Sequence, residues 1–341
     1  MPSQLLLDED ARNALCGVPV EALQGKTVIL TGATGVVGIH FLACLSYAQR
    51  HMGVRIEVIA VSRRAPPSHV KHIVGDANVR FLSVDIAEPK NIALLPTADV
   101  IIHSAGYGQP ALFLDKPLST IKLNTAGTLG LLDRLRATGA FLFLSSSEVY
   151  SGLGDPPFRE DQIGSTSPSH SRACYIEAKR CAEAICHAAR AGGVNAKAAR
   201  LALAYGPGAR SGDRRVLYSL IERGAVEGRV RILDRGLAWR TYCYVGDAVH
   251  MMLRVLLEGR QAVYNVGGIS RTTIRGLADA VGGLMNVPVD VPEGDAAAAL
   301  GAPDDVWLDL SQYEAEFGPV KFTDLNTGLR RCIRWHREVN A

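Results

Sequence analysis

The feature that most constrains the fold is a glycine-rich turn that directly follows a short apolar segment. Residues 26–30 read Lys-Thr-Val-Ile-Leu, as expected for a strand buried on both faces, and residues 31–38 continue as Thr-Gly-Ala-Thr-Gly-Val-Val-Gly. The glycines Gly32, Gly35 and Gly38 permit a tight turn, close backbone approach to a phosphate, and packing of a helix against the strand. The alternative is an ordinary strand-to-helix turn. The preceding strand favours a dinucleotide-binding turn.

Strand-like segments and helical patterns alternate along the first two thirds of the chain. Further strand-like runs lie at residues 56–61, 79–84, 100–103, 141–145 and 198–204, and helical patterns lie at residues 37–49, 118–137 and 175–190. This alternation predicts an α/β fold, with a Rossmann-type doubly wound parallel sheet. A smaller C-terminal α/β substrate domain is expected to follow it.

The length of 341 residues suits two domains. We expect an N-terminal lead-in at residues 1–24 and an NAD(P)-binding Rossmann domain at residues 25–207, to which residues 240–270 return. Residues 208–239 and 271–341 would form the substrate-binding domain. The strand-to-helix passage at residues 242–257 is expected to rejoin the large sheet.

Composition excludes several functional classes. The 37 Lys and Arg residues nearly balance the 34 Asp and Glu residues, which argues against a nucleic-acid partner. The seven cysteines form no C-x-x-C pair and no metal-ligand spacing, so we expect free thiols in a reducing cytoplasm and no metal. Residues 1–10 lack a signal-peptide pattern, and no apolar run reaches membrane-spanning length. A cytoplasmic protein with no membrane partner is predicted.

The end of the second strand bears on the choice between NAD and NADP. An acidic side chain there would bind the ribose hydroxyl of NAD, whereas cations would pair with the 2′-phosphate of NADP. This chain has Arg63 and Arg64 and no acid, which favours NADP, unless the two are a solvated surface pair. The other positions expected to contact the cofactor lie in the glycine turn or at strand ends: Thr34, Val36, Val37, Asp85, Ile86, Ser104, Ala105 and Gly106.

A second motif supplies candidate catalytic groups. Tyr175 and Lys179 lie one turn apart on a predicted helix, and Ser146 ends the fifth strand. A free phenol has a pKa of about 10, and a nearby ammonium and a positive nicotinamide would lower it toward neutrality. A surface tyrosine and a serine-rich strand end are the alternatives. The order of glycine turn, serine and Tyr/Lys pair favours hydride transfer at a carbinol carbon.

On these residues the chain resembles the extended short-chain dehydrogenases/reductases of the NAD-dependent epimerase/dehydratase family, over about residues 25–335. Further segments that carry the resemblance are residues 124–128, 205–207, 244–247 and 265–267. Within the family the chain is most similar to UDP-glucuronate decarboxylases, through residues 122–129, 147–150, 172–180, 213–216 and 240–245.

The resemblance implies a nucleotide diphosphate sugar as substrate, oxidation at sugar C4, and a retained NAD(P). It implies a homodimer that pairs through the helices near residues 118–137 and 175–190. It adds Asn124 to the cofactor contacts. The positions expected to contact the substrate are Tyr107, Glu148, Arg215 and Arg240; for Arg240 a surface position beside Trp239 is the alternative.

Glu148 bears on the class of reaction. Simple 4-epimerases of the family commonly have a small polar residue there, whereas dehydratases and decarboxylases have Glu, because a proton must also move at C5. A 4,6-dehydratase usually has Asp immediately before this Glu, and here the preceding residue is Ser147, as in decarboxylases. Alternatively, Glu148 would be a strand-end carboxylate that binds backbone N–H groups.

Three departures affect the substrate. The family's Asn before the Tyr-Gly-Pro turn is Leu203, the C-terminal Asp-Pro-x-Arg element reads Pro-Asp-Asp-Val at residues 303–306, and the loop at residues 107–110 is not the Ser/Pro-rich loop of glucuronate decarboxylases. In addition, Arg63 stands where decarboxylases normally have an acid. The leading interpretation is a UDP-glucuronate decarboxylase-like enzyme. The alternatives are a nucleotide-sugar 4-epimerase or 4,6-dehydratase, an NADPH-dependent 4-keto-sugar reductase, and a non-catalytic NAD(P)-binding scaffold.

Overall fold

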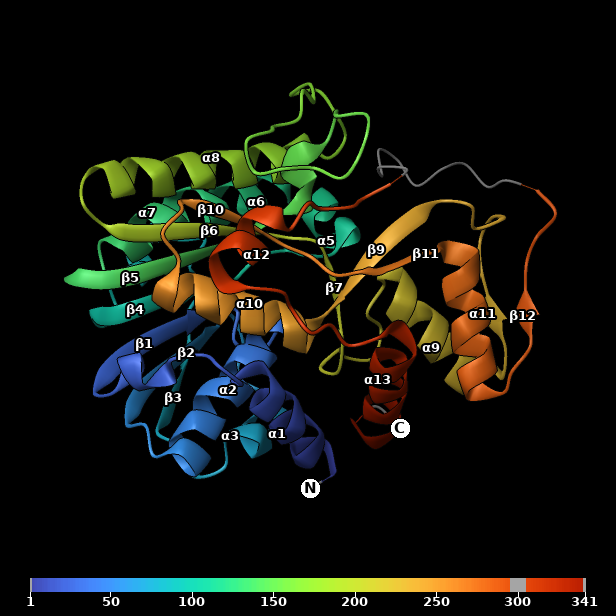
Figure 1. The fold of residues 1–341 in the computed structure, drawn as a ribbon, viewed down its shortest axis with the longest axis horizontal. Helices are drawn as coiled ribbons and strands as arrows, with labels where there is room; N and C mark the ends of the chain where they lie inside the picture. Colours follow the sequence, from blue (N-terminus) through green and yellow to red (C-terminus); the bar gives the residue numbers. More distant parts are fainter. Residues whose placement is uncertain (1, 295–304, 340–341) are drawn as a thin grey trace.

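Within residues 2–294 and 305–339, which the computed structural model describes, seven strands form one twisted sheet (Figure 1). Neighbouring strands pair in parallel throughout. This confirms the predicted doubly wound α/β fold. In spatial order the strands are β10 (Val263–Val266), β6 (Asn195–Leu201), β5 (Leu135–Ser146), β4 (Ala98–His103), β1 (Lys26–Thr31), β2 (Ile56–Ser62) and β3 (Val79–Ser83).

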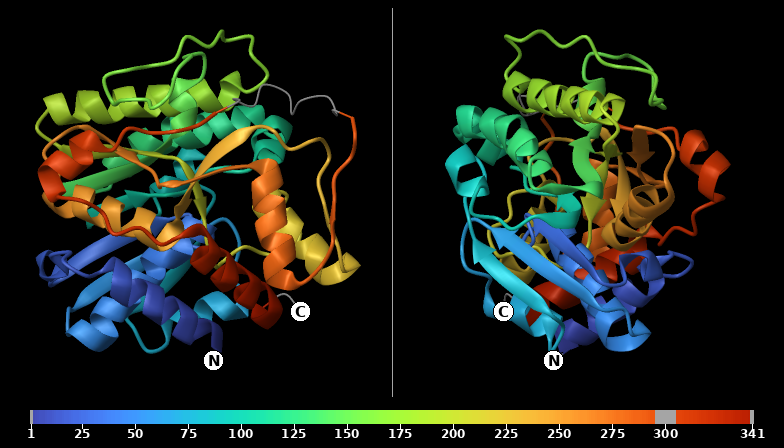
Figure 2. Two further views of the ribbon diagram at one scale, coloured as in Figure 1. Left: turned by 45° about the vertical axis from the view of Figure 1, so that its right-hand side comes forward. Right: turned by 90° about the vertical axis from the view of Figure 1, so that its left-hand side faces the viewer.

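Both faces of the sheet are covered by helices. Successive residues of a strand point to opposite faces, so a strand that is apolar along its length needs a cover on both sides. Val28 and Leu30 of β1 face one core, and Ile29 faces the other. The two helical layers lie on opposite sides of the sheet (Figure 2). The first contains α1 (Pro2–Ala14), α2 (Val36–Met52), α3 (Ser68–Val74) and α10 (Val245–Glu258), and the second α4 (Pro89–Ile92), α5 (Pro110–Asp115), α6 (Pro117–Asn124), α7 (Ala126–Leu132) and α8 (Ala173–Ala191).

Beyond β6 the chain also builds two smaller sheets. One contains β7 (Leu203–Tyr205), β9 (Trp239–Tyr244) and β11 (Ser270–Thr273), and the other pairs β8 (Val230–Arg231) with β12 (Val289–Asp290). The accompanying helices are α9 (Val216–Glu227), α11 (Ile274–Met285), α12 (Ser311–Phe317) and α13 (Leu325–Val339). No helix among the described residues has the length and hydropathy needed to cross a membrane. The predicted division into domains stays a prediction.

The predicted helix at residues 118–137 is wrong in its extent. The structure divides this segment into α6 and α7 at Thr125, and residues 135–137 already belong to β5. Leu135 aligns with Ala98 of β4, and the Ala98 N–H donates to the Arg134 carbonyl at 2.9 Å. Pairing with β4 therefore overrides the local helical pattern.

The sheet assignments after residue 198 are also corrected. The single strand expected at residues 198–204 is broken at Ala202, so that β6 stays in the large sheet and β7 joins a smaller one. The strand expected to return with residues 242–257 is β9, which lies beside β7, and the return to the large sheet is made by β10.

The N-terminal helix is part of the core. Leu6, Leu7 and Ala11 are buried against the sheet-covering helices. Asp10 is also buried, accepts a hydrogen bond from the Tyr244 hydroxyl at 2.8 Å, and pairs with Arg331 of α13 at 2.9 Å. Burial raises the pKa of Asp10 to about 6, and Arg331 opposes that rise. This ion pair therefore ties the two ends of the chain together.

We expect Asp10→Ala to lower the free energy of unfolding by about 3–5 kcal/mol, because it leaves a partly buried guanidinium without its buried partner. Urea unfolding measures this change. Glu9→Ala is the matched control: Glu9 pairs with the same Arg331 at 3.1 Å but is 52% exposed, against 4% for Asp10. The control should cost no more than about 1 kcal/mol. Equal losses in the two variants would contradict a special role for the buried pair.

Candidate active site

The glycine turn forms a cradle made of backbone. Gly32 has φ of +70°, and a Cβ there would lie 2.7 Å from the backbone of Ala105 in the loop after β4. A Cβ at Gly38 would lie 2.1 Å from the Gly32 carbonyl oxygen. Only glycine fits these positions. The packing brings the loop after β4 against the turn where the predicted residues Thr34, Gly35, Val36 and Val37 lie.

The start of α2 suits a bound pyrophosphate. The helix begins at Val36, and its N-cap, Gly35, provides no side chain to bond the first N–H groups. Those groups and the positive end of the helix dipole are what binds phosphate in a dinucleotide site. At the end of α6, Asn124 is fully buried and its Oδ1 has no hydrogen-bond partner among the described residues. The residues present therefore fit a dinucleotide cofactor.

The strand-end residues predicted for the cofactor gather at one edge of the sheet, because their strands are parallel. Asp85 and Ile86 follow β3, and Ser104, Ala105 and Gly106 follow β4. A Cβ at Gly106 would lie 3.8 Å from Lys179 Nζ, so this loop meets the predicted catalytic helix.

Arg63 and Arg64 are exposed just beyond the end of β2. Arg63 donates a hydrogen bond to the Tyr107 hydroxyl at 2.7 Å. Tyr107, predicted as a substrate contact, thus lies beside a residue predicted to bind the cofactor.

Tyr175 and Lys179 are both buried on α8, close to the end of β5. Tyr175 bonds the Ser146 side chain, and its ring stacks on Phe113 with centroids 4.6 Å apart. Lys179 Nζ donates to the Leu144 carbonyl at 2.6 Å and lies 5.6 Å from the centre of the Tyr175 ring. The structure therefore brings Ser146, Tyr175 and Lys179 together.

Burial dominates the proton affinities of this pair. It raises the pKa of Tyr175 to about 12 and lowers the pKa of Lys179 to about 7, because a buried site disfavours both charged forms. The influences that lower the pKa of Tyr175 are the hydrogen bond with Ser146 and the charge of Arg172. The sequence analysis had instead expected the Lys179 ammonium to lower this pKa.

Glu148 lies in the short helical turn that follows β5. Its N–H donates to Ser146 Oγ at 3.2 Å, and its carboxylate forms a partly buried ion pair with Arg172. Burial raises the pKa of Glu148, and the charges of Arg172, His170 and Arg240 oppose that rise. The carboxylate is thus held by a guanidinium, in contrast to the alternative of backbone N–H partners. The sequence analysis did not single out Arg172 as functional, although it lies three residues before Tyr175.

The two predicted substrate arginines are placed differently. The charge of Arg240 lowers the pKa of Glu148, and the Arg240 guanidinium donates a hydrogen bond to the Trp239 carbonyl at 2.6 Å. Arg215 instead pairs with Asp213 at 2.6 Å and stacks over Tyr218. Arg240 is therefore the one seen to interact with the catalytic cluster.

A buried ion pair behind the cluster escaped the sequence analysis. Glu183 of α8 pairs with Arg200 of β6 at 2.8 Å and accepts a hydrogen bond from Ser145. Arg200 also donates to the Tyr150 hydroxyl at 2.9 Å, and that hydroxyl donates to Asn265 at 2.7 Å. The network anchors α8 and the end of β5, and so holds the groups beside Ser146.

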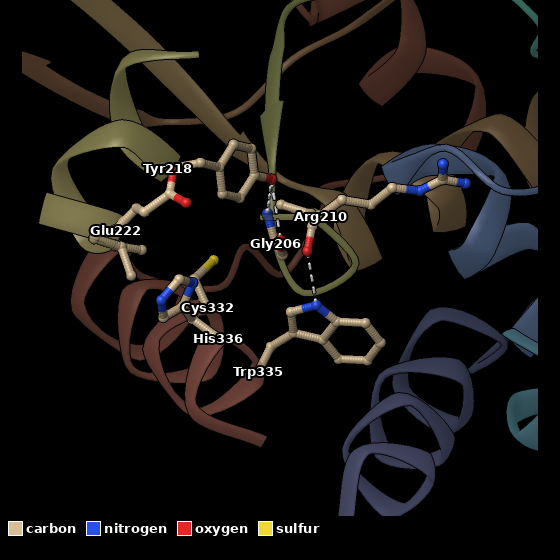
Figure 3. Close-up of a pocket in the computed structure, with 9 residues that line it drawn as sticks. Gly206, Arg210, Tyr218, Glu222, Cys332, Trp335 and His336 are labelled. Carbon is tan, nitrogen blue, oxygen red and sulfur yellow. Dashed lines mark hydrogen bonds between the residues drawn. The ribbon is translucent and has the colours of Figure 1, made fainter. Parts of the chain in front are cut away.

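A small pocket lies elsewhere, between the turn after β7, α9 and α13 (Figure 3). Trp335 donates to the Ala209 carbonyl at 3.0 Å, and the Tyr218 hydroxyl donates to the Gly206 carbonyl at 3.0 Å. None of the predicted site residues lines this pocket. Its contacts hold the turn at residues 206–209, in which the Gly208 backbone packs on Val36 at the start of α2.

The sequence of the chain matches a known protein family and several characterised relatives. A model of the "NAD dependent epimerase/dehydratase family" matches residues 28–267. UDP-glucuronic acid decarboxylase 1 of Xenopus tropicalis is 28% identical over 321 residues, which cover 92% of this chain and 72% of that protein. UDP-glucuronic acid decarboxylase 6 of Arabidopsis thaliana is 30% identical over 273 residues, which cover 77% and 76%.

The fold is also found among solved structures. The dTDP-glucose 4,6-dehydratase DesIV of Streptomyces venezuelae, solved with NAD bound, matches with a TM-score of 0.79 and 22% identity. The match covers 92% of this chain and 98% of that one.

We expect Glu183→Ala to lower the free energy of unfolding by about 3–5 kcal/mol, because Arg200 would stay buried without its counter-charge. Glu177→Ala on the same helix is the matched control, since Glu177 is 42% exposed in its pair with Arg180. That control should change stability by less than about 1 kcal/mol. Thermal and urea unfolding compare the two, and similar small losses would refute the anchoring role.

Proposed function

The chain belongs to the NAD dependent epimerase/dehydratase family, and from that premise we propose that it oxidises C4 of a nucleotide diphosphate sugar, with decarboxylation of a UDP-hexuronate as the leading reaction. The broader class is that of enzymes that modify nucleotide sugars with a nicotinamide cofactor. The observation that carries the narrower proposal is the partly buried carboxylate of Glu148 beside Ser146 and Tyr175, with Ser147 before it.

The first step is proton removal from the sugar C4 hydroxyl. The Tyr175 phenolate accepts this proton, and Ser146, which bonds the tyrosine, also bonds the substrate oxygen. A nicotinamide cofactor would supply the redox chemistry, as acceptor and donor of the C4 hydride. Lys179 would hold the cofactor ribose, and its charge favours the phenolate when its amine is protonated.

Loss of CO₂ follows from the ketone formed at C4. In a hexuronate this ketone is β to the carboxylate, so the C5–C6 bond can break while its electron pair moves into the C4 carbonyl as an enolate. A proton from solvent water then adds to C5, and the Glu148 carboxylate orients the water that supplies it. Tyr175 returns its proton to O4 as the C4 carbonyl is reduced, which completes the reaction.

For the cofactor we propose NADP over NAD. Arg63 and Arg64 provide two cations beyond β2, where a 2′-phosphate would lie, and no acid takes their place between residues 61 and 64. The hydrogen bond from Arg63 to Tyr107 links these cations to the loop after β4. The similar dehydratase DesIV was solved with NAD, so cofactor content is part of the test below.

Particular residues support the competing reactions. Leu203 replaces the family's asparagine and is partly exposed on β7, opposite Tyr242. Because this replacement changes a substrate contact, 4-epimerisation and 4,6-dehydration of another sugar remain alternatives. Arg63 and Arg64 favour a reductase that takes NADPH to a 4-keto sugar. A non-catalytic scaffold would not need the buried Tyr175 and Lys179.

We further propose a homodimer in the cytoplasm. The exposed side of α6 to α8 carries apolar and small residues, of which Leu118 is 73% exposed and Leu129 is 54% exposed. Cys181, Ala184 and Ala188 are exposed on the neighbouring α8. Such a face suits packing against a second copy of the same helices.

We expect Tyr175→Phe to lower C4 oxidation by about 10²–10⁴-fold, because the proton acceptor is lost while the fold is kept. Purified protein is first analysed for NAD and NADP, then incubated with a panel of nucleotide sugars, and product mass is followed. Loss of CO₂ supports the leading proposal; loss of water, unchanged mass and gain of two hydrogens indicate the three alternative reactions. Tyr47→Phe, a tyrosine of α2, is the control and should retain activity. Full activity in Tyr175→Phe would refute the mechanism.

Leu118→Glu combined with Leu129→Glu is expected to convert the dimer to a monomer, because both charges would be buried at the interface. Sedimentation velocity measures the change. Val226→Glu introduces the same charge at a 78% exposed position on α9 and should leave the dimer intact. A monomeric wild-type protein would exclude the proposed assembly.

A further inference from the structure

Arg172 lies closer to the catalytic groups than its place before α8 suggests. It is 7% exposed, occupies the N-cap position of α8 and forms a partly buried ion pair with Glu148. Its guanidinium lies 5.3 Å from the centre of the Phe113 ring, and the Tyr175 ring stacks on Phe113 with centroids 4.6 Å apart. Contacts with both Glu148 and Phe113 therefore restrain the guanidinium.

The ion pair leaves one carboxylate oxygen available. Glu148 Oε1 accepts the bond from Arg172, whereas Glu148 Oε2 is buried and has no hydrogen-bond partner among the described residues. Arg172 Nε is also buried and has no hydrogen-bond partner in the described part of the chain. A buried orphan oxygen costs stability unless something bonds to it, so this one is a candidate contact for a substrate.

We propose that Arg172 is a positioning residue for the proton transfer at sugar C5: it holds Glu148 ionised through Oε1 and so presents Oε2 to the substrate. The inference rests on the proposed function, since it needs a sugar oxidised at C4. After loss of CO₂ from a hexuronate, Oε2 accepts a hydrogen bond from the water whose proton adds to C5. In a 4-keto sugar that keeps C6, the C5–H bond breaks, its electron pair moves into the C4 carbonyl as an enolate, and the proton goes to Oε2. The reverse transfer returns the proton to C5.

The charges around Glu148 agree with this role. Three cationic or titratable groups face it, namely Arg172 and His170 from the segment leading into α8 and Arg240 from β9, and Tyr175 lies within electrostatic range. Burial raises the pKa of Glu148, and Arg172 is the largest influence that lowers it. Without Arg172 the pKa of Glu148 should move higher, so that the ionised form is lost over more of the acidic range.

The first experiment needs no substrate. Carboxyl carbons of glutamate are labelled with ¹³C, and NMR follows the titration of Glu148 in the wild type, in Arg172→Met and in Arg172→Lys, with Glu148→Gln to assign the signal. We expect the titration of Glu148 to move to higher pH in Arg172→Met and part of the way in Arg172→Lys. An unchanged titration in Arg172→Met would overturn the proposal, whatever reaction the protein performs.

The second experiment separates the two chemical steps. In D₂O, with UDP-glucuronate and dTDP-glucose as probes, absorbance follows oxidation at C4 and NMR follows deuterium at C5. We expect Arg172→Met to lower C5 exchange by about 10²-fold, with kcat affected more than KM, and to shift the acidic limb of C5 exchange to higher pH. C4 oxidation should fall by a smaller factor, because the charge of Arg172 also lowers the pKa of Tyr175. Arg172→Lys should restore part of the exchange, and Arg190→Met at the far end of α8 should match the wild type.

A double variant completes the test. Because both residues act through one carboxylate, Arg172→Met combined with Glu148→Gln should lose no more exchange than Glu148→Gln alone. Additive losses would overturn the proposal, and so would a KM increase confined to UDP-glucuronate, which would make Arg172 a substrate ligand. Failure of the wild type to oxidise C4 of any sugar would refute the proposed function, while the NMR titration would still decide the role of Arg172.

Discussion

The close approach of backbone at Gly32 is the constraint on which the site depends. The glycine turn can touch the backbone of Ala105 only because Gly32 has no side chain, and Gly38 in turn packs on Gly32. The contact sets the start of α2 beside the loop after β4, and that loop reaches Lys179 of α8 through Gly106. One backbone contact thus joins the cofactor cradle to the catalytic helix.

Local patterns were sufficient to predict this part of the molecule. The apolar run before Gly32 and the spacing of its glycines predicted β1 and α2, and the Tyr175/Lys179 spacing placed both side chains on one helix. The errors occurred where distant pairing decides the structure. Residues 135–137 read as helix but pair with β4, and the chain changes sheets at Ala202 with no marked change in composition.

The ionic partners of the site could not be deduced for a similar reason. Glu183 and Arg200 lie on different elements, and nothing in their spacing indicates that the fold buries them as a pair. The sequence gives Glu148 its place at the end of β5, but its bond to Arg172 depends on how the segment before α8 folds back. Charge compensation in a buried site is a tertiary property, so single-sequence patterns supply its members without their partners.

The proposed catalytic residues and the proposed substrate contacts lie on different elements of the fold. This separation explains how the substrate contacts can differ from the family pattern while the proposed catalytic residues match it. Ser146, Glu148 and Tyr175 come from β5, the turn after it and α8, which the Glu183–Arg200 pair anchors to the large sheet. Leu203 and Arg240 come from β7 and β9, in a separate sheet. Replacement of a side chain on β7 leaves the packing beneath Tyr175 untouched. A replacement at Leu203 can therefore change the proposed substrate contacts without disturbing the packing of Tyr175, whereas a replacement at Arg240 would also change the charge around Glu148.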